Sequence, residues 1–331
     1  MPYFDSFSRP INYLRVSVTD RCNLRCVYCM PAEGIDPIRH EDVLRYEEIA
    51  RVVRAAAALG IMKVRLTGGE PLVRRGLPDL VKLIAAVPGI DVVSMTTNGI
   101  LLPRYAHELA AAGLHRVNVS LDSLRPERFR AITRRGELAD VWAGVEAAER
   151  AGLTPVKLNV VVIRGLNDDE AVDFARLTTE QPLNVRFIEV MPLGANEHWA
   201  EDGYVSMSEV RVRIEAQFGP LESVGRDDRV VGNGPARYHR VPGAPGTLGF
   251  ITPVSEHFCF RCNRLRLTAD GQLRPCLLSD DEIDLRAALR GGASDEELQH
   301  VVAQAIAAKP ARHHLAEGDV PHARQMAQIG G

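Results

Sequence analysis

The sequence lacks long apolar runs and an excess of charge of either sign. No uninterrupted apolar run among its 331 residues approaches the ~20 that a membrane-spanning helix needs, and the first residues show no basic region followed by an apolar stretch. The formal net charge of -3 provides no basic field that would attract nucleic acid or anionic lipid. We therefore expect a cytoplasmic protein that binds neither nucleic acid nor a membrane.

Phosphate-binding loops are also missing. The chain contains no match to G-x-x-x-x-G-K-[ST] or to G-x-G-x-x-G. A bound nucleotide would therefore be held by other means, and an anionic partner would have to meet arginines and lysines concentrated at one place.

Cysteine is absent outside two groups of three. In a reducing compartment such groups bind metal in preference to forming disulfides. A closed zinc site uses four protein ligands, whereas three thiolates hold three corners of a cubane cluster and leave the fourth iron open. The sequence therefore predicts two [4Fe-4S] clusters, each with one vacant iron. Their ligands are Cys22, Cys26 and Cys29 (the first trio, C-x3-C-x2-C) and Cys259, Cys262 and Cys276 (the second trio, C-x2-C-x13-C).

A zinc site is the alternative interpretation of each trio. His40 is a candidate fourth ligand for the first trio, and His257, two residues before Cys259, is one for the second. With zinc at both places, the chain would be a non-enzymatic zinc or electron-transfer protein.

Strand and helix patterns alternate from residue 11 to about 190. Helices over 47–59 and 141–151 are the clearest, because apolar residues recur every three or four positions and glycine follows the end. Repeated βα units predict a parallel sheet with right-handed crossovers, and six units are too few for a closed eight-stranded barrel. An open, partial barrel or a doubly wound sheet remains. The expected strands lie near residues 13–18, 63–66, 92–96, 117–121, 156–162 and 184–188.

The alternation is expected to stop after Met191. Glycine and proline are frequent from about 220 to 247, as in a linker. A new module then carries the second trio, a polar helix over 295–308 and a terminal Gly-Gly. We therefore divide the chain into an α/β core, residues 1–220, and a C-terminal region, residues 221–331.

The first trio falls in the loop after the first strand, where the βα loops of barrel enzymes carry reactive groups. Later strands end in Leu66–Pro71, which contains Gly-Gly-Glu-Pro, and in Asn118–Ser123. We expect exposed backbone N–H and C=O groups beside the two glycines, suited to an ammonium and a carboxylate. Together with the cysteine spacing, these segments resemble the radical S-adenosylmethionine superfamily.

This resemblance implies a partial (β/α)6 barrel whose first cluster binds S-adenosylmethionine through its open iron. An electron from the reduced cluster then cleaves the sulfonium to a 5′-deoxyadenosyl radical, which abstracts a hydrogen atom.

Cationic residues recur on the expected strands. Period-two geometry places Lys63 and Arg65 on one face, which in a sheet wrapped by helices is the lumen. Cations there would be buried together unless an anion compensates them. A polyanionic substrate would supply that charge. The alternative is that these cations cap strand ends or pair with acids such as Glu70 and Glu189. The cations are Arg15, Lys63, Arg65, Lys157 and Arg186.

The second ligand of the second trio, Cys262, is followed by a pair of arginines, in Asn263-Arg264-Leu265-Arg266. Three auxiliary cysteines followed by Asn-Arg-x-Arg resemble the GTP 3′,8-cyclase family of molybdenum cofactor biosynthesis, and the resemblance covers nearly the whole chain. It implies that the open iron of the second cluster contacts the guanine base and that basic residues grip the triphosphate.

The resemblance also assigns site residues. The tail, Gly330 and Gly331, is implied to reach into the active site, although a chain end usually frays. The implied S-adenosylmethionine contacts are Tyr28, Gly69, Ser120 and Met191. The implied GTP contacts are Arg15, Arg65, Thr96, Lys157, Arg264, Leu265 and Arg266, with Lys63 and Arg186 as additions.

The implied reaction is cyclisation of GTP to (8S)-3′,8-cyclo-7,8-dihydroguanosine 5′-triphosphate, a lyase-class step that begins molybdenum cofactor (molybdopterin) biosynthesis. The 5′-deoxyadenosyl radical removes the ribose 3′ hydrogen and the C3′ radical attacks guanine C8, so no side chain acts as acid or base. We expect an external low-potential reductant, transfer of the product to cyclic pyranopterin monophosphate synthase, and a monomer or homodimer. The rival hypothesis is a radical S-adenosylmethionine enzyme with an auxiliary cluster that acts on a peptide or another metabolite.

Overall fold

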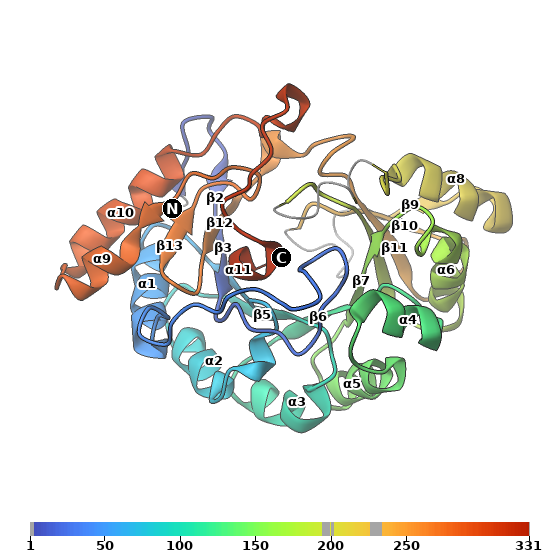
Figure 1. Ribbon diagram of the computed structural model, residues 1–331, viewed down its shortest axis with the longest axis horizontal. Coiled ribbons are helices and arrows are strands. Elements are labelled where there is room, and N and C mark those ends of the chain that lie inside the picture. The colour runs from blue at the N-terminus through green and yellow to red at the C-terminus, as the bar shows by residue number, and fades with distance from the viewer. Residues whose placement is uncertain (1–2, 194–198, 200–201, 226–233, 331) are drawn as a thin grey trace.

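A twelve-stranded mixed sheet curls around a central space, and helices cover its outer face (Figure 1). The computed structural model describes residues 3–193, 199, 202–225 and 234–330. In spatial order the sheet contains β14 (Ile283–Asp284), β13 (Gln272–Arg274), β12 (Arg264–Leu267), β3 (Tyr13–Ser17), β4 (Lys63–Thr67), β5 (Val92–Thr97), β6 (Arg116–Ser120), β7 (Lys157–Val162), β8 (Asn184–Glu189), β11 (Thr247–Ile251), β10 (Arg237–Arg240) and β9 (Glu222–Ser223).

Most of the helices connect one strand of the sheet to the next along the chain, and they pack on its outer face. A separate hairpin pairs β1 (Tyr3–Phe4) with β2 (Pro10–Ile11). In the described residues, no helix combines the length and the apolar character that crossing a bilayer requires. The helices are α1 (Tyr46–Ala58), α2 (Leu77–Ala85), α3 (Leu102–Ala111), α4 (Pro126–Thr133), α5 (Leu138–Arg150), α6 (Ala171–Glu180), α8 (Met207–Phe218), α9 (Leu285–Arg290), α10 (Asp295–Ala307) and α11 (Met326–Ile329).

The six predicted strands are confirmed as β3 to β8, and the predicted helices as α1, α5 and α10. Alternation along β3 explains why the prediction succeeded. Leu14 and Val16 are fully buried and belong to the apolar core, while Tyr13 and Arg15 belong to the opposite, lumen-facing set. The partial barrel is therefore the correct alternative, and the doubly wound sheet is wrong.

The expectation that the alternation stops after Met191 is wrong. After β8 the chain forms α8 and returns through β9 and β10 to β11, which pairs parallel with β8. At the other end of the barrel β12 pairs parallel with β3. Eight parallel strands thus stand side by side, β12, β3 to β8 and β11. All five residues of β11 are buried, so this strand lacks the alternation that marks a half-exposed strand.

The barrel stays open, and the C-terminal part of the chain joins the same sheet as the core. No pairing within the described residues joins β11 to β12. The expected boundary at residue 220 falls between α8 and β9, and the strands beyond it extend the sheet at both ends.

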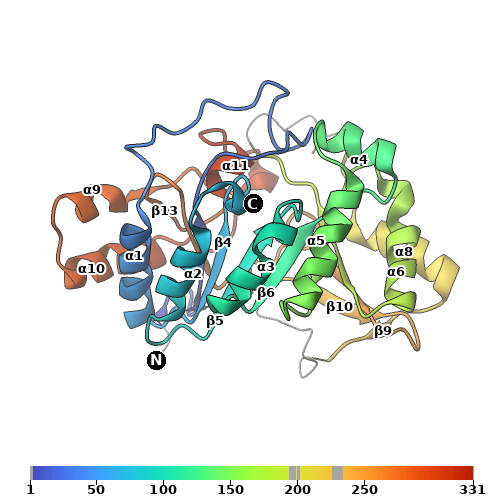
Figure 2. The same cartoon turned by 90° about the horizontal axis from the view of Figure 1, so that it is seen from below.

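Parallel pairing gives the barrel two chemically different ends. The loop after β3, which carries the first trio, lies at the carboxyl end of the strands together with α11 (Figure 2). The second trio lies at the amino end: Cys259 and Cys262 directly precede β12, and Cys276 follows β13, which is antiparallel to β12. The two trios therefore stand at opposite ends of one lumen.

Candidate active site

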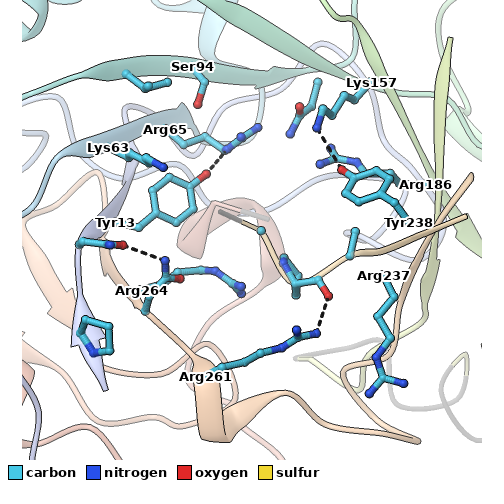
Figure 3. A pocket seen from close by; sticks show the side chains of 18 of the residues that line it. Tyr13, Lys63, Arg65, Ser94, Lys157, Arg186, Arg237, Tyr238, Arg261 and Arg264 are labelled. Carbon is cyan, nitrogen blue, oxygen red and sulfur yellow. Dashed lines mark hydrogen bonds between the residues drawn. The ribbon is translucent and has the colours of Figure 1, made fainter. Parts of the chain in front are cut away.

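A cavity of about 960 Å³ opens at the amino end of the barrel lumen (Figure 3). Its volume lies within the range of small-molecule sites. Cations enter it from several strands and from the segment that carries the second trio (Figure 3). The cations in its lining are Arg9, Lys63, Arg65, Arg116, Lys157, Arg186, Arg237, Arg261 and Arg264.

Three arginines of neighbouring strands form a row beside this cavity. Arg15 of β3 stands opposite Arg65 of β4 on one side and Arg266 of β12 on the other. Burial, followed by the charge of Arg266, lowers the pKa of Arg15, and burial with Arg264 nearby lowers that of Arg266 to about 10. No carboxylate of the described residues pairs with these three, and the Arg15 Nε atom is buried without a partner there. The row favours binding of an anion.

The alternative in which Glu70 and Glu189 neutralise the lining cations is wrong. Glu70 accepts hydrogen bonds from Thr97 Oγ1 at 2.8 Å and from the Asn98 backbone N–H at 2.7 Å. Burial raises the pKa of Glu70 to about 7 even though these bonds oppose the shift. Glu189 accepts from the Ser255 backbone N–H at 3.0 Å. Both carboxylates therefore accept hydrogen bonds from loops at the carboxyl ends of the strands and not from the lining cations.

Two tyrosines that the sequence analysis missed face the cavity from opposite walls (Figure 3). The Tyr13 hydroxyl accepts a hydrogen bond from Arg65 Nε, and the Tyr238 hydroxyl accepts one from Lys157 Nζ at 3.0 Å. Burial alone would raise the pKa of Tyr13, but Arg65 and Arg15 outweigh it and lower the pKa to about 8. Burial, then the charge of Arg186, lowers the pKa of Lys157 to about 7.

A signal for Tyr13 was present in the sequence, because it lies two residues before Arg15 on one strand. Tyr238 stands in the Gly- and Pro-rich segment, which showed no strand pattern.

The first trio gathers in the loop after β3. The Cys29 backbone N–H donates to the Cys26 carbonyl at 2.9 Å. Burial raises the pKa of the Cys22 thiol to about 11 and that of Cys29, which Cys22 also raises, to about 12. Buried thiols that raise each other's pKa become thiolates when a cationic metal group supplies the opposing charge.

A buried lysine lies beside the second trio, and the sequence gave no reason to select it. Lys309 Nζ donates to the Arg264 carbonyl at 2.8 Å and to the Pro275 carbonyl at 2.6 Å, and it lies 3.8 Å from Cys262 Sγ. Burial would raise the pKa of Cys262, but Lys309 and Arg264 outweigh it and lower the pKa. The second trio therefore lies in a more cationic environment than the first.

Three thiolates suit a cubane cluster, which leaves one iron open, better than a closed zinc site, which takes four protein ligands. Within the described residues, no three His, Cys, Asp or Glu side chains converge as ligands of a single metal ion. His257, the proposed fourth ligand of the second trio, packs against the ring of His313 with centroids 5.4 Å apart. In a cubane each thiolate binds a different iron, so the ligands need not converge on one point. Each donor set fits a cluster held by Cys22, Cys26 and Cys29 or by Cys259, Cys262 and Cys276.

The Gly-Gly-Glu-Pro segment holds the loop of the first trio in place. The backbone N–H of Gly69 donates to the Thr19 carbonyl and that of Glu70 to the Arg21 carbonyl, both at 2.8 Å. The expectation that these N–H groups are exposed is therefore wrong. A Cβ atom on Gly69 would lie 2.5 Å from the Arg21 carbonyl oxygen, so only glycine permits this approach.

The predicted S-adenosylmethionine contacts come from segments at the carboxyl end of the barrel. Ser120 ends β6 and Met191 follows β8 by two residues. The Tyr28 hydroxyl donates to Asp122 Oδ2 at 2.6 Å. This bond fixes the ring of a residue that lies between two cysteines of the first trio in the sequence. Burial raises the pKa of Asp122 to about 6.

The tail reaches the row of arginines from inside the barrel (Figure 1). The Gly330 carbonyl accepts from Arg266 Nη1 at 2.9 Å and from Arg15 Nη2 at 3.5 Å. Gly330 has a φ of +80°, and a Cβ atom there would lie 2.6 Å from Thr67 Cγ2. Gly330 is therefore buried and not frayed, while Gly331 lies outside the described residues.

Two predicted GTP contacts have restricted roles. Thr96 Oγ1 accepts from Arg65 Nη1 at 3.4 Å and so stands beside the arginine row. The Leu265 side chain is fully buried in the apolar core, so only its main chain can face a ligand.

Comparisons with known proteins match this geometry. Residues 16–178 match the Radical SAM superfamily and residues 183–315 match Molybdenum Cofactor Synthesis C. The chain is 57% identical over 327 residues to a GTP 3′,8-cyclase of Pelotomaculum thermopropionicum and 56% identical over 330 residues to one of Heliobacterium modesticaldum, with 99% of each chain covered. The chain belongs to the GTP 3′,8-cyclase family. The cofactors of this family member are S-adenosylmethionine and two [4Fe-4S] clusters.

Solved structures share the barrel of this GTP 3′,8-cyclase family member. Streptococcus suis SuiB bound to the precursor peptide SuiA is similar with a TM-score of 0.59 and 13% identity, over 86% of this chain and 67% of that one. At this identity the likeness shows the fold alone.

We predict that Gly69→Ala removes the first cluster. The added methyl group would overlap the Arg21 carbonyl and displace the loop of the first trio. Iron and sulfide analysis after anaerobic reconstitution should show a loss of about half the metal. Gly225→Ala is the matched control, because a Cβ atom at Gly225 meets nothing within 4 Å. Full iron content in Gly69→Ala would contradict this role.

Proposed function

We propose that the protein converts GTP to (8S)-3′,8-cyclo-7,8-dihydroguanosine 5′-triphosphate, the first step of molybdenum cofactor biosynthesis. The observation that carries this proposal is a cation-lined cavity in the lumen of a barrel that carries the two cysteine trios at its opposite ends. When bound, S-adenosylmethionine and the first cluster supply the one-electron chemistry that starts the reaction.

The protein's own residues bind and orient the substrate. Lys63, Arg65 and Arg264 face the cavity (Figure 3), and guanidinium groups bind phosphate oxygens through paired, charge-assisted hydrogen bonds. A triphosphate there supplies the negative charge that the described carboxylates do not. With the base held near the second trio, the ribose lies between the two ends of the lumen, and this fixed orientation favours one reacting hydrogen.

We also propose that an external low-potential reductant supplies the electron and that the product passes to cyclic pyranopterin monophosphate synthase. The setting we propose is the cytoplasm, with the protein acting as a monomer or homodimer.

The central test is the release of 5′-deoxyadenosine from S-adenosylmethionine by reduced, anaerobically reconstituted protein. We expect GTP to increase the rate at least tenfold, because only a bound substrate presents a hydrogen atom to the cofactor. ATP, which carries the same triphosphate on another base, is the control. A rate that GTP does not change would favour the rival hypothesis of a peptide or other metabolite.

We predict that Arg266→Met weakens GTP binding by about 10- to 100-fold, since a hydrogen bond to a charged group contributes about 1.5–3 kcal/mol. The melting temperature of the ligand-free protein should stay equal or rise, because the variant removes one of three neighbouring buried charges. Titration calorimetry with GTP and a thermal melt check both parts. Arg312→Met, at an exposed ion pair with Glu317, is the control, and unchanged GTP affinity in Arg266→Met would refute the assignment.

We predict that GTP affinity falls as the pH rises from 7 to 9. The pKa of Lys157 is about 7 without ligand, and a bound triphosphate raises it. Binding therefore takes up a proton between about pH 7 and the raised pKa, and the affinity falls as the pH rises through this window. Ionisation of Tyr13, with a pKa of about 8, acts in the same direction. Calorimetry in buffers of different ionisation enthalpy measures the proton uptake, and Lys157→Arg should flatten the pH dependence. An affinity that is constant across this range would contradict the prediction.

A further inference from the structure

Lys309 places a buried ammonium group against the second trio. The residue follows the C-terminal end of α10 and is only 4% exposed. An ammonium group has three N–H donors. Two of them meet the Arg264 and Pro275 carbonyls at 2.8 and 2.6 Å, and Cys262 Sγ lies within reach of the third at 3.8 Å.

The charge of Lys309 has no carboxylate partner in the described part of the chain. A neighbouring buried cation shows the contrast, since Arg9 pairs with Asp5 at 2.6 Å and both side chains are nearly inaccessible. Burying an uncompensated ammonium is costly. The anions available to Lys309 are the thiolates of the second trio, with Cys262 Sγ at 3.8 Å.

The backbone around Lys309 is fixed by Arg9. The Arg9 guanidinium donates to the Cys259 carbonyl at 2.7 Å, to the Pro310 carbonyl at 2.7 Å and to the Ala311 carbonyl at 3.0 Å. These bonds join the segment after α10 to the loop that carries the second trio. Arg9 thus holds the two segments together with a charge that Asp5 neutralises, and Lys309 adds a charge that no acid of the described residues neutralises.

We propose that Lys309 is a positioning residue whose buried charge stabilises the reduced form of the cluster held by the second trio. This inference rests on the proposed function only in that the second trio binds a cluster. The reduced cluster carries one more negative charge than the oxidised one, so a fixed cation beside a ligand sulfur stabilises it preferentially and raises its reduction potential.

The test measures the potential of the second cluster alone. In the full-length chain, Cys22, Cys26 and Cys29 are replaced by Ser, so that the second trio holds the remaining iron. We expect Lys309→Met in this background to change the ratio of reduced to oxidised cluster at a fixed potential at least tenfold, which is about 59 mV towards lower potential. A redox titration followed by electron paramagnetic resonance gives this value. Lys309→Arg should keep the reduction potential close to that of the parent. Lys82→Met, which changes an exposed lysine on α2, should leave the potential unchanged.

The outcomes separate this inference from the proposed function. A parent protein without iron would overturn the second cluster and with it the proposed function. A parent with about four irons whose potential is unchanged by Lys309→Met would overturn the role of Lys309 alone. If Lys309→Met binds no cluster, Lys309→Gln, which keeps amide donors without the charge, is titrated instead. A lowered potential in Lys309→Gln supports the inference, and loss of the cluster from this variant as well would make Lys309 structural and refute it.

Discussion

The site depends on cations buried side by side inside a barrel, where no acid of the described residues neutralises them. Arg15 stands between Arg65 and Arg266 in the register of three parallel strands, where repulsion and desolvation both oppose folding. The opposite face of the same strands supplies compensation, because Leu14 and Val16 are fully buried against the helices and each such side chain contributes about 1.5–3 kcal/mol. The apolar wall thus stabilises a lumen that is unfavourable until an anion enters.

Because the strands are parallel, the two cofactor sites lie at opposite ends of this lumen. Every strand from β12 through β3 to β11 has the same direction, so a loop before β12 and a loop after β3 must lie at opposite ends. A shorter barrel without β12 would leave the second trio with no fixed position relative to the first. The parallel pairing of Arg264 with Tyr13 and of Arg266 with Arg15 therefore sets the separation of the two sites.

Local patterns in the sequence were sufficient for the six central strands, the two trios and the lumen cations, because period-two alternation and cysteine spacing are short-range signals. They were insufficient where a contact joins distant segments. β11 is buried on both faces and has no alternation, and Lys309 is a single lysine after a helix whose partners lie about 35 to 45 residues away. The Gly69 backbone N–H was misjudged because its partner, the Thr19 carbonyl, belongs to another loop.

The tail places one carbonyl group against the cationic lumen, where it accepts hydrogen bonds without neutralising the cations. The Gly330 oxygen accepts from Arg266 and Arg15, and a guanidinium has five N–H donors, so the carbonyl occupies only one donor of each side chain. A neutral carbonyl orients the two side chains and reduces their repulsion less than a carboxylate would, which preserves the attraction for a triphosphate. A side chain at this position would meet Thr67 and would require an unfavourable positive φ. Glycine is therefore required at 330 for a tail that orders the arginines and still leaves space for the substrate.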